Sequence, residues 1–392
     1  MRGGFYDRWL LAGVYWFLLG MAWAPGSRIY QQGLVALLWL PVALCAWPAR
    51  AQWQALWQRR GSGLVALAGL LVWALFSLSW STADDLGREA KRVLYVVLFL
   101  GSFVLVAGAE PERLARVLRT SGLGLALAAL ASIVVFYGVS GQPWPARLEG
   151  IGHLQNPILG GYVMGVAALW LLCLPHERGG WRMAAVAGVL LLVVYMALTQ
   201  SRGVWLAFVA TAVSIPLCCP GRGSWRFSVA LLGCTVFGLI LFEPLVMERG
   251  TSYRPEIAEA ALAMIRENPV LGLGIGADYR IQVPELGLAF QHSHNLFTHV
   301  AIELGLPGLL LWSIVWGWVG FDAWRARFSI LGGCLLAMWG YATFVLMFDG
   351  ASLLDSPRPA WMLSWLLVAL WLVLPGGGRA AASVPSSAAA GR

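Results

Sequence analysis

The sequence predicts an all-α polytopic membrane protein with about twelve transmembrane helices. Hydrophobic residues make up 59% of the 392-residue chain and charged residues only 12%, whereas a soluble domain has about 25% charged residues. Apolar runs of about 17 to 23 residues recur from end to end, and a helix of that length crosses a hydrocarbon core of roughly 30 Å. These runs leave no stretch for a separate soluble domain, so we expect residues 1–375 to form a single transmembrane domain.

Each expected helix is an apolar run bounded by arginine, glycine or proline. The twelve runs cover residues 9–24, 33–48, 63–80, 93–109, 121–138, 158–175, 183–199, 203–219, 227–244, 307–323, 329–348 and 359–375. The first run is not followed by a clear cleavage site, so we interpret it as a retained helix. An even number of crossings places both termini on the same side of the membrane.

The arginines predict which side that is. Those in short loops concentrate on the side of the termini, among them Arg50, Arg59, Arg60 and Arg116. Because basic residues of short loops accumulate in the cytoplasm, we expect both termini to be cytoplasmic. The net charge of +8 is scattered over these loops rather than gathered on one face, which argues against a nucleic-acid partner and for contact with membrane lipids.

The longest polar stretch covers residues 245–306, between the ninth and tenth expected helices, and would lie on the outer side. It contains a helical signal of its own at 255–268, which begins with Pro255 and has apolar residues at helical spacing, so we expect an amphipathic helix on the bundle or at the membrane surface. Residues 376–392 are rich in Gly, Ala and Ser and predict a disordered cytoplasmic tail.

A candidate general base lies at the end of this loop. We expect Ser293 to cap a helix over residues 296–304, too short to span the membrane, and a new helix to begin at Pro307. His294 would then lie at a helix N-terminus, where the positive end of the dipole disfavours the imidazolium ion. A neutral histidine is a competent general base. The alternative is a histidine that only makes a hydrogen bond at the membrane surface.

Arginines at the outer side are candidate phosphate ligands. Arg202 lies in a tight turn with Gln200 and Ser201, and its planar guanidinium suits bidentate phosphate binding. The alternative is a topology anchor for lipid headgroups. Arg254 opens the loop helix, where a surface ion pair is the alternative, and Arg147 lies in another outer loop.

Three other patterns offer weaker alternatives. His292, His294, His299 and Glu303 include ligand types for zinc, but their spacing does not place them on one helical face. Asp84 and Asp85 could hold a divalent ion, although such a pair more commonly begins an interfacial helix. The glycines of the loop could approach a ligand closely; they are Gly272, Gly274 and Gly276. We therefore predict no metal site.

These segments together resemble a known family. The sequence His294-Asn295, followed after nine residues by Gly305 and Gly308, resembles the signature of bacterial O-antigen ligases, within the O-antigen ligase and polymerase superfamily. The segment 201–203 and the stretch 254–276 resemble other marked segments of that family. The likeness covers about residues 147–308 in motifs and the whole chain in the number of helices.

The resemblance implies a GT-C-type glycosyltransferase in the bacterial inner membrane, with its active site in the long periplasmic loop region. It implies transfer of O-antigen polysaccharide from undecaprenyl diphosphate to the lipid A-core oligosaccharide of lipopolysaccharide, without metal or other cofactor. His294 matches the catalytic histidine of the family. Arg202 and Arg254 match its essential arginines, with Arg147 as a further candidate. The supporting positions are Gln200, Ser201, Asn295, Gly305 and Gly308.

Two other functions remain as alternatives. An O-antigen polymerase shares the donor but elongates a polyprenyl-linked chain. A flippase or other transporter of lipid-linked oligosaccharides also has many helices, but its charged groups should lie near the bilayer midplane on broken helices in related halves. Here the candidate groups concentrate on the outer side and no internal repeat is visible, so the sequence favours an enzyme.

Overall fold

The computed structural model describes residues 4–45, 49–107, 111–175, 179–220, 253–283, 287–350 and 352–375, with parts of 225–233. Most of the predicted ninth helix, residues 245–252 of the long loop and the predicted tail lie outside the described residues. The helices of the bundle are α1 (Phe5–Trp23), α2 (Ser27–Leu34), α3 (Leu40–Cys45), α4 (Arg50–Ser77), α5 (Leu86–Ala107), α6 (Pro111–Ile133), α7 (Pro157–Cys173), α8 (Gly179–Leu198), α9 (Arg202–Cys218), α13 (Leu296–Arg325), α14 (Ile330–Asp349) and α15 (Trp365–Val373).

The chain is a helical, multi-pass membrane protein. Among the described residues six helices are long and apolar enough to cross a membrane: Ser27–Cys45, Arg50–Ser79, Glu112–Val139, Gly179–Leu198, Leu296–Arg325 and Ile330–Asp349. Three shorter apolar helices are α7, α9 and the segment Pro359–Val373. Every predicted run within the described residues corresponds to helical structure, while the total of twelve crossings stays a prediction.

Helix α4 is kinked at Arg60, whose φ of −130° and ψ of 15° are not helical, so two helices meet there. The second is the predicted third run, while the first, which begins at Arg50 and contains Arg59, was expected to be a loop. Arg60 is buried, forms an ion pair with Asp322 of α13, and donates from Nη2 to the carbonyl of Leu374 at 2.8 Å. A buried charge is stable only when it is paired and hydrogen-bonded, and these partners are distant in the sequence.

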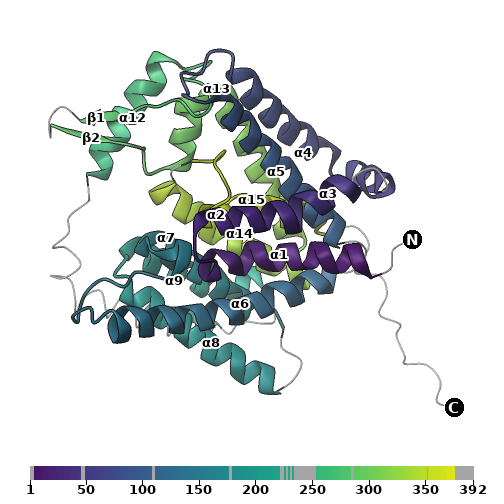
Figure 1. Ribbon diagram of the computed structural model, residues 1–392, viewed down its shortest axis with the longest axis vertical. Helices are drawn as coiled ribbons and strands as arrows, with labels where there is room; N and C mark the ends of the chain where they lie inside the picture. The colour runs from purple at the N-terminus through teal and green to yellow at the C-terminus, as the bar shows by residue number, and fades with distance from the viewer. Residues whose placement is uncertain are drawn as a thin grey trace.

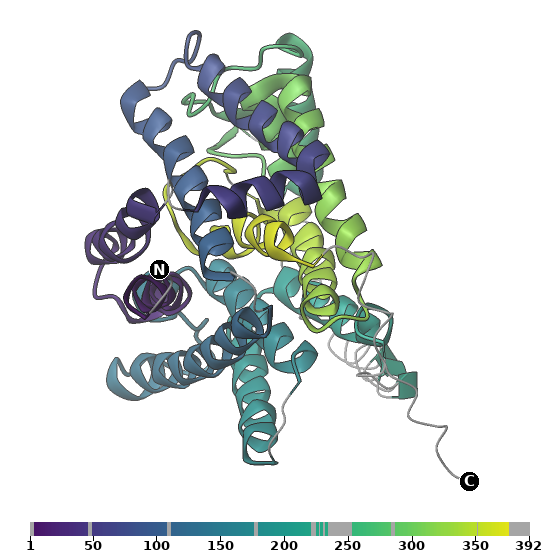
Figure 2. The same cartoon turned by 90° about the vertical axis from the view of Figure 1, so that its right-hand side faces the viewer.

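Between the bundle segments lies a small unit that we call the cap: α12 (Arg254–Glu267), residues 268–280, and the antiparallel strands β1 (Ile281–Val283) and β2 (Leu288–Phe290). The amphipathic helix is confirmed, because Ile257 and Ala261 are buried in a small core with residues of β1 and α13. The hairpin was not predicted. In Figure 1 the cap lies at the upper left and α1 begins at the right; Figure 2 again places the cap at the top, beside the α4–α5 connection.

Helix α13 is broken at Gly305, as predicted. Gly305 has φ 65° and ψ −174°, and Pro307 follows within the same 30-residue helix. A proline has no N–H to donate, so the carbonyl of Glu303 loses its helical partner. The break therefore makes a short half-helix, Leu296 to Leu304, and leaves backbone groups that other parts of the chain must satisfy.

The cap supplies those partners. Gly274 donates its N–H to the carbonyl of Glu303 and Leu273 donates to that of Ile302, both at 2.8 Å, while Leu306 donates to Pro269 at 2.8 Å. On the other side, the indole of Trp73 in α4 donates to the carbonyl of Leu304 at 2.8 Å. These hydrogen bonds fix the cap to the break in α13.

The three loop glycines make this contact close. Gly272, Gly274 and Gly276 all have positive φ. A Cβ at these positions would lie 2.5 Å from the carbonyl oxygen of Glu303, from Cα of Ser81 and from Cδ of Glu89, respectively. The loop thus approaches the chain's own α13 and α4–α5 connection, which replaces the expectation that it approaches a ligand.

The Gly274→Ala variant tests this packing. We expect it to lower the local stability of the cap by about 2–4 kcal/mol, because strain at positive φ adds to overlap with the backbone of Ser81. Gly287 is a matched control: it also has positive φ, but apart from its chain neighbours no atom of the described residues lies within 4 Å of its Cβ position, so Gly287→Ala should cost only about 1 kcal/mol. Hydrogen exchange of α12 measures both, and equal effects would contradict the proposed contact.

Candidate active site

The N-terminus of α13 carries the candidate base. Asn295 is the N-cap, and its side-chain oxygen accepts from the N–H groups of Phe297 and Thr298 at 2.9 and 3.2 Å. The prediction that Ser293 caps this helix is wrong. Its hydroxyl donates to the carbonyl of Asn295 at 2.9 Å instead and lies 2.7 Å from the hydroxyl of Thr298. His294 therefore immediately precedes the cap residue, close to the predicted place.

His294 is paired with an acid that the sequence did not point to. Its Nδ1 lies 3.1 Å from Oδ1 of Asp349, the last residue of α14. A carboxylate only accepts hydrogen bonds, so this contact favours the tautomer with the proton on Nδ1, in which the neutral imidazole has its lone pair on Nε2. The side chain of His294 is 32% exposed and that of Asp349 13%. The imidazole is thus oriented by a largely buried partner and still reachable from outside.

His292 contacts the same imidazole. The two ring centroids are 4.1 Å apart, and the N–H of His294 points to Nδ1 of His292 at 3.4 Å. Burial lowers the pKa of His292, a charge on His294 would lower it further, and Asp349 opposes both. His292 is therefore uncharged near pH 7, which leaves its Nδ1 able to accept from the backbone of His294.

His299 lies on the half-helix beneath the cap and has different partners. Its Nδ1 lies 2.6 Å from the hydroxyl of Tyr279, and its Nε2 lies 3.2 Å from Glu303. The other oxygen of Glu303 accepts from the N–H of Gly276 at 3.0 Å. Burial raises the pKa of Tyr279, so its hydroxyl stays protonated. The part of the chain that the structure describes contains no group of three or more His, Cys, Asp or Glu able to hold a metal ion.

The turn before Arg202 is joined to the loop that contains Arg147. Leu148 donates its N–H to the carbonyl of Leu198 at 3.0 Å. The Nε of Arg147 donates to the carbonyl of Thr199, and the side-chain amide of Gln200 donates to that of Pro145, both at 2.7 Å. The structure thus brings Arg147 against the Arg202 turn, and the Nε–H of Arg147 is engaged by the backbone there.

Tyr162 connects this turn with the histidine. A Cβ at Gly203 would lie 3.2 Å from the hydroxyl of Tyr162. On the other side, the hydroxyl of Tyr341 in α14, about two turns before Asp349, donates to the carbonyl of Tyr162 at 3.3 Å. The guanidinium of Arg254 lies over the ring of Phe348, 5.9 Å from the ring centroid. Phe348 is the residue before Asp349. The Arg202 turn, Arg254 and the His294–Asp349 pair therefore meet at one end of the bundle.

Each of the three candidate segments, those of Arg202, Arg254 and His294, contains a residue with strained backbone. Among the described residues, the non-glycine residues with positive φ are Gln200, Tyr253 and His294. Tyr253 and Gln200 closely precede Arg254 and Arg202. Such conformations cost about 1–3 kcal/mol each and persist where the surroundings impose them, commonly at functional sites. Each candidate segment thus contains a residue held in an unfavourable conformation.

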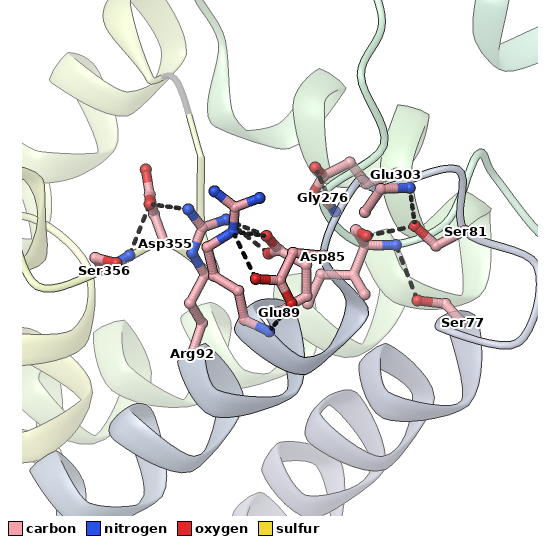
Figure 3. A network of polar contacts seen from close by, with 12 residues as sticks. Ser77, Ser81, Asp85, Glu89, Arg92, Gly276, Glu303, Asp355 and Ser356 are labelled. Atoms are coloured by element: carbon pink, nitrogen blue, oxygen red, sulfur yellow. Dashed lines mark hydrogen bonds and ion pairs between the residues drawn. The ribbon is translucent and has the colours of Figure 1, made fainter.

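A polar network holds the chain that follows Asp349 (Figure 3). Arg92 of α5 pairs with Glu89 at 2.6 Å and with Asp355 at 3.2 Å. Asp85 accepts from the N–H of Arg88 at 2.9 Å at the start of α5, which confirms the interpretation of Asp84 and Asp85 as the beginning of a helix. The network joins α5, the cap glycines and the connection before α15 at the site end of the bundle.

The supporting glycines of the signature act at a distance from the imidazole. Gly305 forms the break in α13, and a Cβ at Gly308 would lie 2.2 Å from that of Leu304. They shape the half-helix that presents His294.

Sequence reasoning missed Asp349 and Tyr162. A signal for Asp349 was present: an acidic residue at a helix C-terminus opposes the helix dipole and therefore suggests a cationic or hydrogen-bonding partner. Tyr162 lies within an apolar run and gave no comparable signal.

Two comparisons with known proteins both give O-antigen ligases. The family model described as O-antigen ligase matches residues 187–313, which include Arg202, Arg254 and His294. An O-antigen ligase of Pseudomonas aeruginosa is 29% identical to this chain over 376 residues, covering 93% of this chain and 92% of that protein. The resemblance of this chain to the O-antigen ligase family is thereby confirmed.

Proposed function

We propose that this protein is an O-antigen ligase that transfers O-antigen polysaccharide from undecaprenyl diphosphate to the lipid A-core oligosaccharide. The observation that carries the proposal is the His294–Asp349 pair, at 3.1 Å, near the arginine segments at one end of a membrane bundle. Residues 1–375 would be one GT-C-type catalytic domain in the bacterial inner membrane. Both termini would lie in the cytoplasm, and the site and the loop 245–306 in the periplasm.

The proposed reaction is a single displacement at the anomeric carbon of the donor. Nε2 of His294 removes the proton from an acceptor hydroxyl as its oxygen forms the new glycosidic bond. The bond between the anomeric carbon and the diphosphate oxygen breaks, the electron pair leaves with the diphosphate, and the configuration inverts. Asp349, hydrogen-bonded to Nδ1, stabilises the imidazolium that forms.

The arginines would hold the diphosphate. Arg202 precedes Gly203, which packs against the hydroxyl of Tyr162, Arg254 lies over Phe348, the residue before Asp349, and Arg147 contacts the Arg202 turn. A leaving diphosphate carries about two negative charges, and fixed guanidinium groups stabilise that charge as it develops. In this scheme the arginines supply the positive charge, and no metal or other cofactor takes part.

Reconstitution of the purified protein tests the function. Vesicles containing diphosphate-linked donor would be given lipid A-core and a polyprenyl-linked acceptor in parallel, with EDTA present. We expect glycan on lipid A-core alone. Transfer to the polyprenyl-linked acceptor would identify a polymerase, and loss of transfer with EDTA would contradict the arginine-based scheme.

The His294→Ala variant should lower kcat in this assay by a factor of about 10³ while donor binding persists, because only the base is removed. Donor binding measured on the same preparation controls for folding. Turnover equal to that of the wild type would rule out His294 as the base.

The Arg202→Lys variant should raise the donor KM about tenfold despite the retained charge, because an ammonium cannot make two parallel hydrogen bonds to phosphate. Arg266, exposed on α12, offers a matched control, and Arg266→Lys should leave KM unchanged. If both variants behave like the wild type, bidentate binding by Arg202 is excluded.

A further inference from the structure

The cap exposes apolar side chains beside the break in α13. Val270 and Leu271 are 59% and 48% exposed, and Leu306, at the break, is 49% exposed. We call these three residues the apolar tip. Hydrophobic side chains of this size favour removal from water by about 1.5–3 kcal/mol each when fully buried. Something other than water is therefore expected to cover the tip.

The tip is held rigidly in place. Leu306 donates its N–H to the carbonyl of Pro269 at 2.8 Å, and a Cβ at Gly305 would lie 2.1 Å from the carbonyl oxygen of Val270. Gly272 donates to the carbonyl of Asn268 at 3.1 Å. Pro269 has no N–H and its carbonyl is paired, which lowers the cost of placing this loop at the edge of the hydrocarbon, because each unsatisfied backbone group there would cost several kcal/mol.

The tip is continuous with a membrane-spanning helix. Leu306 lies within the candidate span Leu296–Arg325, and Leu310, one turn further along the same helix, is 61% exposed. Side chains exposed on a span of this kind face lipid. Val270 and Leu271 therefore extend a lipid-facing surface instead of forming an isolated patch.

Aromatic residues place the tip near the membrane surface. On α4 and just after it, Trp73 and Trp80 have ring centroids 5.8 Å apart, and Phe76 and Trp80 5.2 Å apart. Tryptophan concentrates where the hydrocarbon meets the headgroups. This cluster contacts the same region as the tip, because Trp73 donates to the carbonyl of Leu304 and Ser77 accepts from the N–H of Ile275 at 3.0 Å.

We propose that the apolar tip inserts into the bilayer at the boundary between headgroups and acyl chains, so that the partner of this surface is membrane lipid. The insertion supports the cap from the side of the membrane. If the proposed function holds, it also keeps Arg254, on the same cap, at the depth of a lipid-linked diphosphate.

The test measures depth and does not depend on turnover. Nitroxide labels would be placed by Val270→Cys and Leu271→Cys in the full chain in nanodiscs. Leu288→Cys is the matched control, because Leu288 is also an exposed leucine of the cap, 43% exposed, but lies on β2. The six native cysteines define the background, measured on the wild-type chain treated in the same way.

We expect labels at 270 and 271 to relax with oxygen, which concentrates in lipid, and to be protected from an aqueous nickel chelate, while the label at 288 shows the reverse. Greater accessibility to the nickel chelate at 270 and 271 would overturn the proposal. Protection from both reagents would also overturn it, since it would indicate coverage by protein, such as a second copy of the chain.

A second measurement avoids substitutions altogether. The wild-type chain in vesicles with a diazirine near the start of the lipid acyl chain should, after illumination, carry lipid adducts on the peptide that contains Val270 and Leu271. Adducts on spanning helices without any on this peptide would contradict the insertion.

Discussion

The break in α13 at Gly305 and Pro307 is the constraint on which the rest of the site depends. It creates a short half-helix that begins after Asn295 and ends at the break. It also frees carbonyls that the cap satisfies. The same break thus presents His294 at one end and anchors the cap, with Arg254, at the other.

Much of this arrangement follows from local sequence. Long apolar runs predict membrane helices because a bilayer requires about twenty apolar residues per crossing. Each predicted run within the described residues is helical. The break was predictable because glycine and proline act on their own backbone. The amphipathic helix was predictable because its buried face, with Ile257 and Ala261, repeats at helical spacing.

What could not be predicted depends on contacts between distant segments. Arg60 resembled a loop arginine until the structure paired it with Asp322. The loop glycines suggested close approach to a ligand, yet they allow close approach to Glu303 and Ser81 of the chain itself. Asp349 lies 55 positions beyond His294, and no spacing rule joins them. The positive φ of His294 could not be predicted from the sequence, because only a few per cent of non-glycine residues have positive φ.

In the proposed mechanism Asp349 acts through His294, by fixing its tautomer and stabilising its charged form. A double-mutant cycle on kcat/KM measures this coupling most directly. We expect Asp349→Asn to lower kcat/KM by a factor of about 10² in the wild-type background and to have no further effect when His294 is already glutamine. Losses that simply multiply in the double variant would show independent roles and would contradict the proposed pairing.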